Sequence, residues 1–307
     1  MESKVLRIGT RESQLAVWQA NQVKDLLARQ GYEAELVYIK SEGDLDLQTP
    51  LYEIGVQGIF TRSLDIALLN NRIDLAVHSM KDVPTQLPKG IVQSAVLKRA
   101  SYKDLFVYKG DISFLNDFDS PGVIATSSIR RKAQWLNRYR YHNVVNLRGN
   151  VNTRLRKVAE SDWNGAIFAA AGLDRIELRP ETSIELDWML PAPAQGAIVV
   201  VCRENDSFSF EASNYLNDAS TAMCTKIEKD FLRILLGGCS TPISALAEIN
   251  HEALLFKGNI FTVDGSERVD LEKAVPIHEA ESLGKIAALE ILANGGQVIA
   301  AGIHHER

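Results

Sequence analysis

The chain has 307 residues, of which 46% are hydrophobic and 24% are charged, a composition typical of a soluble globular protein with two or three domains. Its net charge of −5 argues against a general affinity for nucleic acid. The charged N-terminus lacks the apolar core of a signal peptide, and no apolar run approaches the ~18 residues of a membrane span. We therefore expect a cytoplasmic protein without a membrane contact.

The first forty residues predict the start of a parallel α/β unit. Strands are expected at residues 5–8 and 34–40, with a helix of regularly spaced apolar residues between them. Thr10 is the expected N-cap of that helix. Arg11 and Ser13 fall at the helix N-terminus, where backbone N–H groups favour an anion. An ordinary capped helix explains these residues equally well.

A loop at residues 41–51 and a glycine-punctuated G-V-Q-G-I-F segment at 55–60 come next. A helix at 61–69 then leads into the stretch Asp74–Thr85, which reads D-L-A-V-H-S-M-K-D-V-P-T. Its apolar residues predict a buried strand, which Pro84 ends. Ligands of open α/β sheets bind just past the carboxyl ends of strands, although polar surface turns are common too. The polar residues concerned are His78, Ser79, Lys81 and Asp82.

A second α/β unit follows a strand at 91–97. Its strands are expected at 104–107, 122–125, 144–147 and 166–171. The helix after the second of these strands opens with T-S-S-I-R-R. Hydroxyl groups at a helix start, followed by two arginines, suit a carboxylate or a phosphate.

Basic residues are concentrated in this unit. Between Arg130 and Lys157 there are nine Lys or Arg residues, seven of them Arg, and no Asp or Glu. A solvated helix face, a nucleic-acid patch and a pocket for a ligand with many carboxylates all remain possible explanations. Arginine's planar fork suits carboxylates, and few aromatic residues interleave for base stacking, so a pocket is favoured.

An apolar strand after the turn at 190–197 arrives late enough to return to the first sheet. Two lobes joined by two crossings would resemble a hinged binding protein that closes on its ligand. The candidate hinges are 97–101 and 191–196. A third unit follows, with expected helices at 227–236 and 280–292, strands at 244–249, 253–256 and 260–263, and a hairpin turn at Asp264–Gly265.

The cysteines are three in number and form no CxxC pair, which argues against a disulfide framework and a zinc site. Cys202 and Cys224 lie in apolar or helical patterns and read as core residues. Cys239 follows two glycines on a loop, where a thiolate can serve as a covalent attachment point. No histidine lies beside it, so an ordinary free thiol stays open as the alternative.

Six short stretches occur in a fixed order along nearly the whole chain. Together they closely resemble the porphobilinogen deaminase (hydroxymethylbilane synthase) family. The stretches are G-T-R-E-S-Q-L-A-V-W-Q, D-L-A-V-H-S-M-K-D-V-P-T, A-T-S-S-I-R-R-K-A-Q, N-L-R-G-N-V-N-T-R-L, P-A-Q-G-A-I and L-L-G-G-C-S-T-P-I.

The resemblance implies an α/β fold of three domains, the first two like type II periplasmic binding proteins and the third a small α+β domain. The implied boundaries are 1–97 plus 198–217, 98–197 and 218–307. It also implies a monomeric transferase of porphyrin and heme biosynthesis. The family joins four porphobilinogen molecules head to tail, releasing ammonia and hydroxymethylbilane. It builds the chain on a covalent dipyrromethane cofactor, and the resemblance implies no metal.

Site residues are carried over motif by motif. The resemblance assigns catalysis to Asp82 and the thioether attachment of the cofactor to Cys239. The residues it implies for binding cofactor and substrate are Arg11, Ser13, Phe60, Ser79, Lys81, Thr126, Ser127, Ser128, Arg130, Arg131, Arg148, Arg154 and Gln195.

Two positions depart from the family pattern. Gln57 replaces a lysine of the flexible loop, which puts any role of that lysine in doubt. Pro193 stands where the family has Val, in P-A-Q-G-A. A binding protein without catalysis is the main alternative, and a nucleic-acid role would rest on the basic stretch alone.

Overall fold

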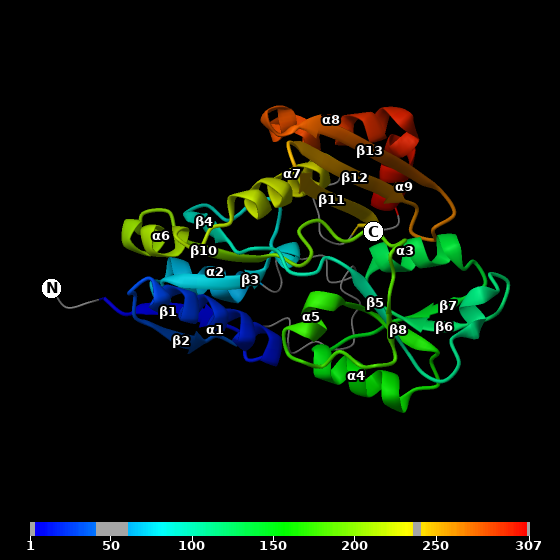
Figure 1. Cartoon of the computed structure of the whole chain (residues 1–307), viewed down its shortest axis with the longest axis horizontal. Helices are drawn as coiled ribbons and strands as arrows, with labels where there is room; N and C mark the ends of the chain where they lie inside the picture. The colour runs from blue at the N-terminus through cyan, green and yellow to red at the C-terminus, as the bar shows by residue number, and fades with distance from the viewer. Residues whose placement is uncertain (1–3, 41–60, 236–240, 306–307) are drawn as a thin grey trace. The chain divides into compact units, whose positions relative to one another are not determined.

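The computed structural model of the chain describes residues 4–40, 61–235 and 241–305 (Figure 1). Internal contacts divide the chain into two units. The first unit holds the described residues up to Ala100 together with residues 196–223, and the second unit holds the rest.

The first unit is built on one five-stranded sheet. Its elements are β1 (Leu6–Thr10), α1 (Gln14–Arg29), β2 (Ala34–Tyr38), α2 (Arg62–Leu69), β3 (Leu75–Ser79), the 3-10 turn η2 (Met80–Asp82), β4 (Ile91–Val96), β10 (Ile198–Arg203) and α6 (Ser207–Asn214). The strand order is β2-β1-β3-β10-β4, and only β10 runs antiparallel to its neighbours. The late apolar strand therefore returns to the first sheet, as its position in the sequence suggested.

A second five-stranded sheet repeats this arrangement in the second unit. Its elements are β5 (Asp104–Tyr108), the short 3-10 helix η3 (Ser113–Asn116), β6 (Val123–Ala125), α3 (Ile129–Arg138), β7 (Asn143–Val145), α4 (Val151–Glu160), β8 (Gly165–Ala169), α5 (Ala170–Asp174) and β9 (Ser183–Glu185). The order is β7-β6-β8-β5-β9, with β5 antiparallel to both neighbours. In both sheets the antiparallel strand occupies the fourth place.

Helices cover both faces of the second sheet, because its strands are apolar on both sides. Leu105 and Val107 of β5 pack in one cluster with Val158 of α4. Phe106, on the opposite face of the same strand, packs with Trp135 of α3. Strands that are buried on both faces read as continuous apolar runs, which is why they were visible in the sequence.

The rest of the second unit is a three-stranded antiparallel sheet backed by helices (Figure 1). Its elements are α7 (Ala219–Leu235, of which residues 219–223 belong to the first unit), β11 (Ile243–Asn250), β12 (Ala253–Phe261), β13 (Arg268–Pro276), η4 (Ile277–Ser282), α8 (Leu283–Ile291), η5 (Leu292–Gly296) and α9 (Gln297–His305). Side chains of these strands and helices share one core, including Phe231, Phe256 and Ile291. The α/β class with a smaller C-terminal α+β part is confirmed, while the three domain boundaries stay a prediction.

The cap of helix α1 differs from the expectation. The N-cap is Ser13, whose hydroxyl accepts a hydrogen bond from the Ala16 N–H at 3.4 Å. Thr10, the expected cap, is the fully buried last residue of β1 and stands opposite Tyr38 of β2. Pairing with β2 thus extends β1 by two residues and delays the helix.

Two expectations in the C-terminal part were also wrong. The strands expected at 253–256 and 260–263 are one strand, β12, because β11 and β13 pair with it on both sides across Lys257–Asn259. The last helix does not stop at Gly295–Gly296. The left-handed conformation of Gly295 (φ 104°) makes a kink there, and α9 follows.

Residues Ile277–Ile303 form a 27-residue helical stretch that is long and apolar enough to cross a membrane by length and composition. The uninterrupted apolar runs within this stretch are shorter than a membrane span, because Lys285 and Glu290 interrupt it. Leu283, Ala287 and Ile291 pack in the core of the second unit. Core helices of soluble proteins pass the same test, so this stretch is weak evidence for a membrane contact.

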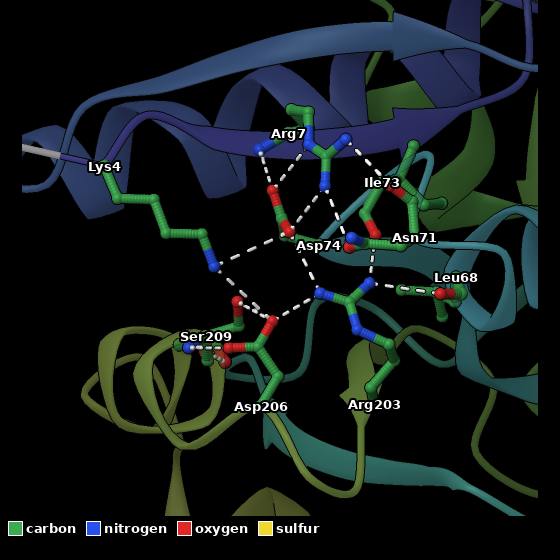
Figure 2. A network of polar contacts seen from close by, with 10 residues as sticks. Lys4, Arg7, Leu68, Asn71, Ile73, Asp74, Arg203, Asp206 and Ser209 are labelled. Carbon is green, nitrogen blue, oxygen red and sulfur yellow. Dashed lines mark hydrogen bonds and ion pairs between the residues drawn. The ribbon is translucent and has the colours of Figure 1, made fainter.

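A network of ion pairs stabilises one edge of the first sheet (Figure 2). Asp74, whose side chain is 1% exposed, accepts hydrogen bonds from Arg7 Nε at 2.9 Å and from Arg203 Nη2 at 3.0 Å. Arg203 also pairs with Asp206, and Lys4 lies within 3.7 Å of both carboxylates. The network joins β1 and β10 to the residue before β3, at the amino edge of the parallel strands.

The charge state of Asp74 links this network to pH. Burial raises the pKa of the Asp74 carboxyl, but hydrogen bonds from Arg7 and Arg203 outweigh burial and bring the pKa below its ordinary range. A lowered pKa stabilises the fold above the unfolded-state value of about 4, and that stability is lost as the pH falls towards the folded-state value.

We predict that Asp74→Asn lowers the free energy of unfolding by about 3 kcal/mol at pH 7, because Arg7 and Arg203 lose their shared counter-charge. Urea denaturation of wild type and variant between pH 7 and pH 3 measures this difference, which should shrink below pH 5. Asp25→Asn, at an exposed position on α1, should be neutral. A difference that does not change with pH would contradict the assignment.

Candidate active site

The carboxyl edge of the first sheet brings together the candidate residues of two motifs. Arg11 and Ser13 follow β1, while Ser79 ends the neighbouring parallel strand β3. Gln19, on α1, donates a hydrogen bond from Nε2 to Ser79 Oγ at 2.9 Å. The helix after β1 is therefore tied to the end of β3, as the sheet order requires.

Asp82 closes the short turn η2 directly after β3. The turn is held by backbone hydrogen bonds from Val83 N to Met80 O at 3.2 Å and from Met80 N to Ala197 O at 3.0 Å. The Asp82 side chain is half-buried. Within the part of the chain that the structure describes, no hydrogen bond or ion pair engages its carboxylate. Asp82 is therefore a fixed acid that remains available to a ligand.

His78 lies in β3, four residues before Asp82, and is 7% exposed. Burial, reinforced by the charge of Arg11, lowers the pKa of its imidazole to about 3. Its Nε2 is buried and has no hydrogen-bond partner among the described residues. A histidine with this pKa is neutral at physiological pH, so it adds no positive charge near Asp82.

The carboxyl edge of the second sheet carries two helix N-termini. Ser128 caps α3 by accepting from Arg131 N at 3.4 Å, and Asn150 caps α4 by accepting from Thr153 N at 2.9 Å. Ser127 joins the two turns, because its hydroxyl donates to Leu147 O at 2.6 Å and accepts from Leu147 N at 2.9 Å. The Thr126 hydroxyl accepts from Ser128 N at 3.2 Å. Two N-termini at one edge favour bound anions.

Arg130 and Arg131 are held by a buried carboxylate. Asp104, the fully buried first residue of β5, lies 2.7 Å from Arg130 Nη2 and 2.7 Å from Arg131 Nη2. Gln195 donates from Nε2 to the same carboxylate at 2.9 Å. Burial lowers the pKa of Arg130, the neighbouring Arg131 lowers it further, and Asp104 opposes both. Because the single Asp104 carboxylate pairs with both the Arg130 and the Arg131 guanidinium groups, one positive charge remains in excess.

Asp104 was not a candidate in the sequence, although it organises three residues that were. The stretch from Arg130 to Lys157 contains no acid, and the balancing charge comes from the start of an antiparallel strand. That start lies opposite Ala169 at the carboxyl end of β8. Knowledge of the strand order, which places β5 beside β8, would have revealed it.

Arg148 lies in the turn between β7 and α4, and Arg154 lies in the first turn of α4. Arg148 is 5% exposed, so its guanidinium is almost completely buried. Arg154 donates from Nε to Gly149 O at 2.7 Å, and Lys157 donates to Arg148 O at 3.2 Å. Gly149 has a φ of 114°, and a Cβ there would meet Thr153 at 2.7 Å, so this turn requires glycine.

The structure adds Arg175 to the candidates. It follows α5, the short helix after β8, and its burial lowers the pKa of its guanidinium to about 10. This partly buried arginine extends the positive set at the same edge, and its sequence neighbours, which include Asp174 and Glu177, did not mark it as a candidate. Phe60 and Cys239 lie outside the described residues. No cluster that could hold a metal ion occurs within the described residues.

We predict that Asp104→Asn lowers the free energy of unfolding by about 3–5 kcal/mol, because two buried guanidinium groups lose their counter-charge. Thermal or urea denaturation gives the measurement. Asp187→Asn is the matched control: its carboxylate, 76% exposed, pairs with Lys103 at 2.6 Å, and its loss should change stability by less than about 1 kcal/mol. Equal effects of the two substitutions would show that Asp104 is not the organising acid.

Family models match the two parts of the chain. Residues 6–211 match "Porphobilinogen deaminase, dipyromethane cofactor binding domain", and residues 222–293 match "Porphobilinogen deaminase, C-terminal domain". An ancestral cationic amino acid solute binding protein of known structure covers 69% of the chain and 87% of its own, with 14% identity and a TM-score of 0.44.

Relatives with similar sequences extend over almost the full length. Porphobilinogen deaminase of Syntrophotalea carbinolica is 41% identical, covering 99% of this chain and 97% of its own. That of Geobacter sulfurreducens is 39% identical, covering 97% and 95%. The chloroplastic enzyme of Oryza sativa is 39% identical, covering 95% and 84%. The resemblance seen in the six motifs is thus confirmed, and this chain belongs to the porphobilinogen deaminase family.

Proposed function

We propose that this chain is a hydroxymethylbilane synthase, which condenses four porphobilinogen molecules into a linear tetrapyrrole and releases ammonia at each step. The observation that carries this proposal is the match of both family models, which together span residues 6–211 and 222–293. The arrangement of the described candidate residues supports it, because each stands at the carboxyl edge of a sheet, where ligands bind.

The negative charge of the substrate fits the positively charged groups at the carboxyl edge of the second sheet. Porphobilinogen carries an acetate and a propionate, so a growing oligomer accumulates carboxylates. Arg148 is buried at this edge, and the capped N-termini of α3 and α4 lie at the same edge. Arginine and helix N-termini both favour carboxylates. Arg130 and Arg131 supply excess positive charge while Asp104 fixes their positions.

A dipyrromethane cofactor has the same acid side chains and fits these residues. When bound, it supplies the pyrrole carbon to which the first substrate is added. We propose that Arg148, Arg154 and the serines at the α3 N-terminus hold its carboxylates. We propose Cys239 as its attachment point. Helix α7 ends at Leu235, four residues before this cysteine.

Asp82 is the proposed catalytic residue. Loss of ammonia from the aminomethyl group of porphobilinogen leaves a positively charged pyrrole, and a carboxylate held beside it stabilises the charge as it develops. Asp82 is fixed by the η2 turn and is not engaged by another described group. Because His78 is neutral, it does not oppose the cation. Cytoplasmic location and a monomeric state are proposed from the sequence alone.

We predict that Asp82→Asn reduces the rate of porphobilinogen consumption at least about 100-fold, because the amide cannot stabilise a cation as a carboxylate does. Its thermal stability should stay close to wild type. Asp25→Asn serves as the matched substitution at an exposed helix position and should keep full activity. An Asp82→Asn variant with near-normal turnover would remove Asp82 from the mechanism.

We predict that Cys239→Ser loses the covalent cofactor. Mass spectrometry of the intact, denatured protein should show wild type heavier than its sequence by two pyrrole units, and the variant at its sequence mass. Cys224→Ser, at a buried position on α7, should keep the adduct. An adduct that persists in Cys239→Ser would assign the attachment to another residue.

A further inference from the structure

We propose that a cavity in the second unit is a binding site for a small aromatic cation, distinct from the residues assigned to porphobilinogen. Its volume is about 340 Å³, within the range of small-molecule sites. Strands β11–β13 form one side, and the segments 102–103 and 187–191 form the other. None of the candidate binding residues lines it.

The register of the three-stranded sheet explains why polar side chains line this cavity. Leu246, Lys257 and Glu272 stand opposite one another on the three strands, as do Ser244, Asn259 and Asp270. Residues two apart along a strand share a face, so all of these lie on one face. The other face carries Ala245, Ala247 and Phe256, which pack in the core. The cavity therefore lies on the polar outer face.

Aromatic and apolar side chains form the rest of the wall. Tyr102 and Trp188 both line the cavity, and Met189 and Leu246 are buried in it at 3% and 6% exposure. The Arg138 guanidinium lies 5.0 Å from the Trp188 ring centroid, so this ring already attracts one cation. Such walls suit a flat ligand that carries a positive charge.

The charges around the opening are mostly negative. Four carboxylates and only two lysines line the cavity. Lys103 pairs with Asp187 at 2.6 Å, Lys257 pairs with Glu272 at 3.0 Å, and Arg268, outside the lining, pairs with Asp270 at 3.0 Å. Glu248 has no ion pair within the described residues. The carboxylate of Glu248 is thus the uncompensated charge among the lining residues, and it favours a cationic ligand over an anionic one.

Asn259 adds a hydrogen-bonding requirement. It is 5% exposed, and its buried Oδ1 has no hydrogen-bond partner in the described part of the chain. A buried acceptor without a donor is unfavourable. The N–H groups of an ammonium ligand satisfy an acceptor of this kind, whereas a carboxylate ligand offers no donor.

Three probes of matched shape test the proposal: benzylammonium, benzyl alcohol and benzoate. Titration calorimetry on the purified full chain measures their affinities. We expect saturable binding of benzylammonium with a dissociation constant below 10 mM, weaker binding of benzyl alcohol and none of benzoate. Rising NaCl concentration should weaken the binding of benzylammonium, because the carboxylates near the opening are exposed to salt.

Variants locate the binding. Glu248→Gln removes an exposed charge and should weaken benzylammonium binding about fivefold, while Glu252→Gln, between β11 and β12 and outside the lining, should not. Leu246→Trp should fill the cavity and abolish binding. Because benzylammonium also resembles an aminomethyl pyrrole, a folded Leu246→Trp variant separates this cavity from the substrate site.

Three results would overturn the proposal. Benzylammonium without saturable binding below 10 mM is the first, and benzoate binding as tightly as benzylammonium is the second. Benzylammonium binding that is unchanged in Glu248→Gln, or in a folded Leu246→Trp variant, is the third. Glu248→Gln changes an exposed side chain and should therefore fold. It tests the binding site even if the Leu246→Trp variant does not fold.

Discussion

The carboxyl ends of parallel strands are the constraint on which the site depends. In both five-stranded sheets, the turns after parallel strands meet at one edge, and the candidate residues that the structure describes stand there. The antiparallel strand begins at that same edge, so Asp104, at the start of β5, lies beside the turns after β6 and β8. One topological rule thus places acids, arginines and helix N-termini from distant parts of the sequence at each edge.

Opposite charges have different tasks at the two ends of the strands. At the amino edge of the first sheet, the Asp74 carboxylate forms ion pairs with Arg7 and Arg203, and this network stabilises the fold. At the carboxyl edge of the same sheet, Asp82 has no described partner. In the second unit, Asp104 is shared by two arginines and leaves positive charge for a ligand. The difference between a structural and a functional acid is the number of partners that the fold supplies.

Sequence patterns predicted the strands well where burial was complete. The runs that became β3, β8 and β10 are apolar on both faces, so they are recognisable without any partner. Element ends were predicted less well, because pairing decides them: β2 holds Thr10 in β1, and two neighbours carry β12 through Lys257–Asn259. β13, whose side chains alternate between exposed and mostly only partly buried positions, has no apolar run and was missed.

The site was predicted as a set of motifs, and its internal contacts were not. Residues close in sequence, such as Ser127 and Ser128, could be placed at a helix start from local pattern alone. The partner of Arg130 is 26 residues away on an antiparallel strand, and a single sequence carries no signal for that distance. The neutral state of His78 depends likewise on burial, which appears only once the sheet is assembled.

The most direct measurement of the proposed function is the stoichiometry of the reaction catalysed by the purified chain. Porphobilinogen consumed, ammonia released and linear tetrapyrrole formed can be counted in one reaction mixture. A hydroxymethylbilane synthase gives four molecules of ammonia for each tetrapyrrole, with four porphobilinogens consumed. Binding of porphobilinogen without release of ammonia would instead describe a binding protein and contradict the account.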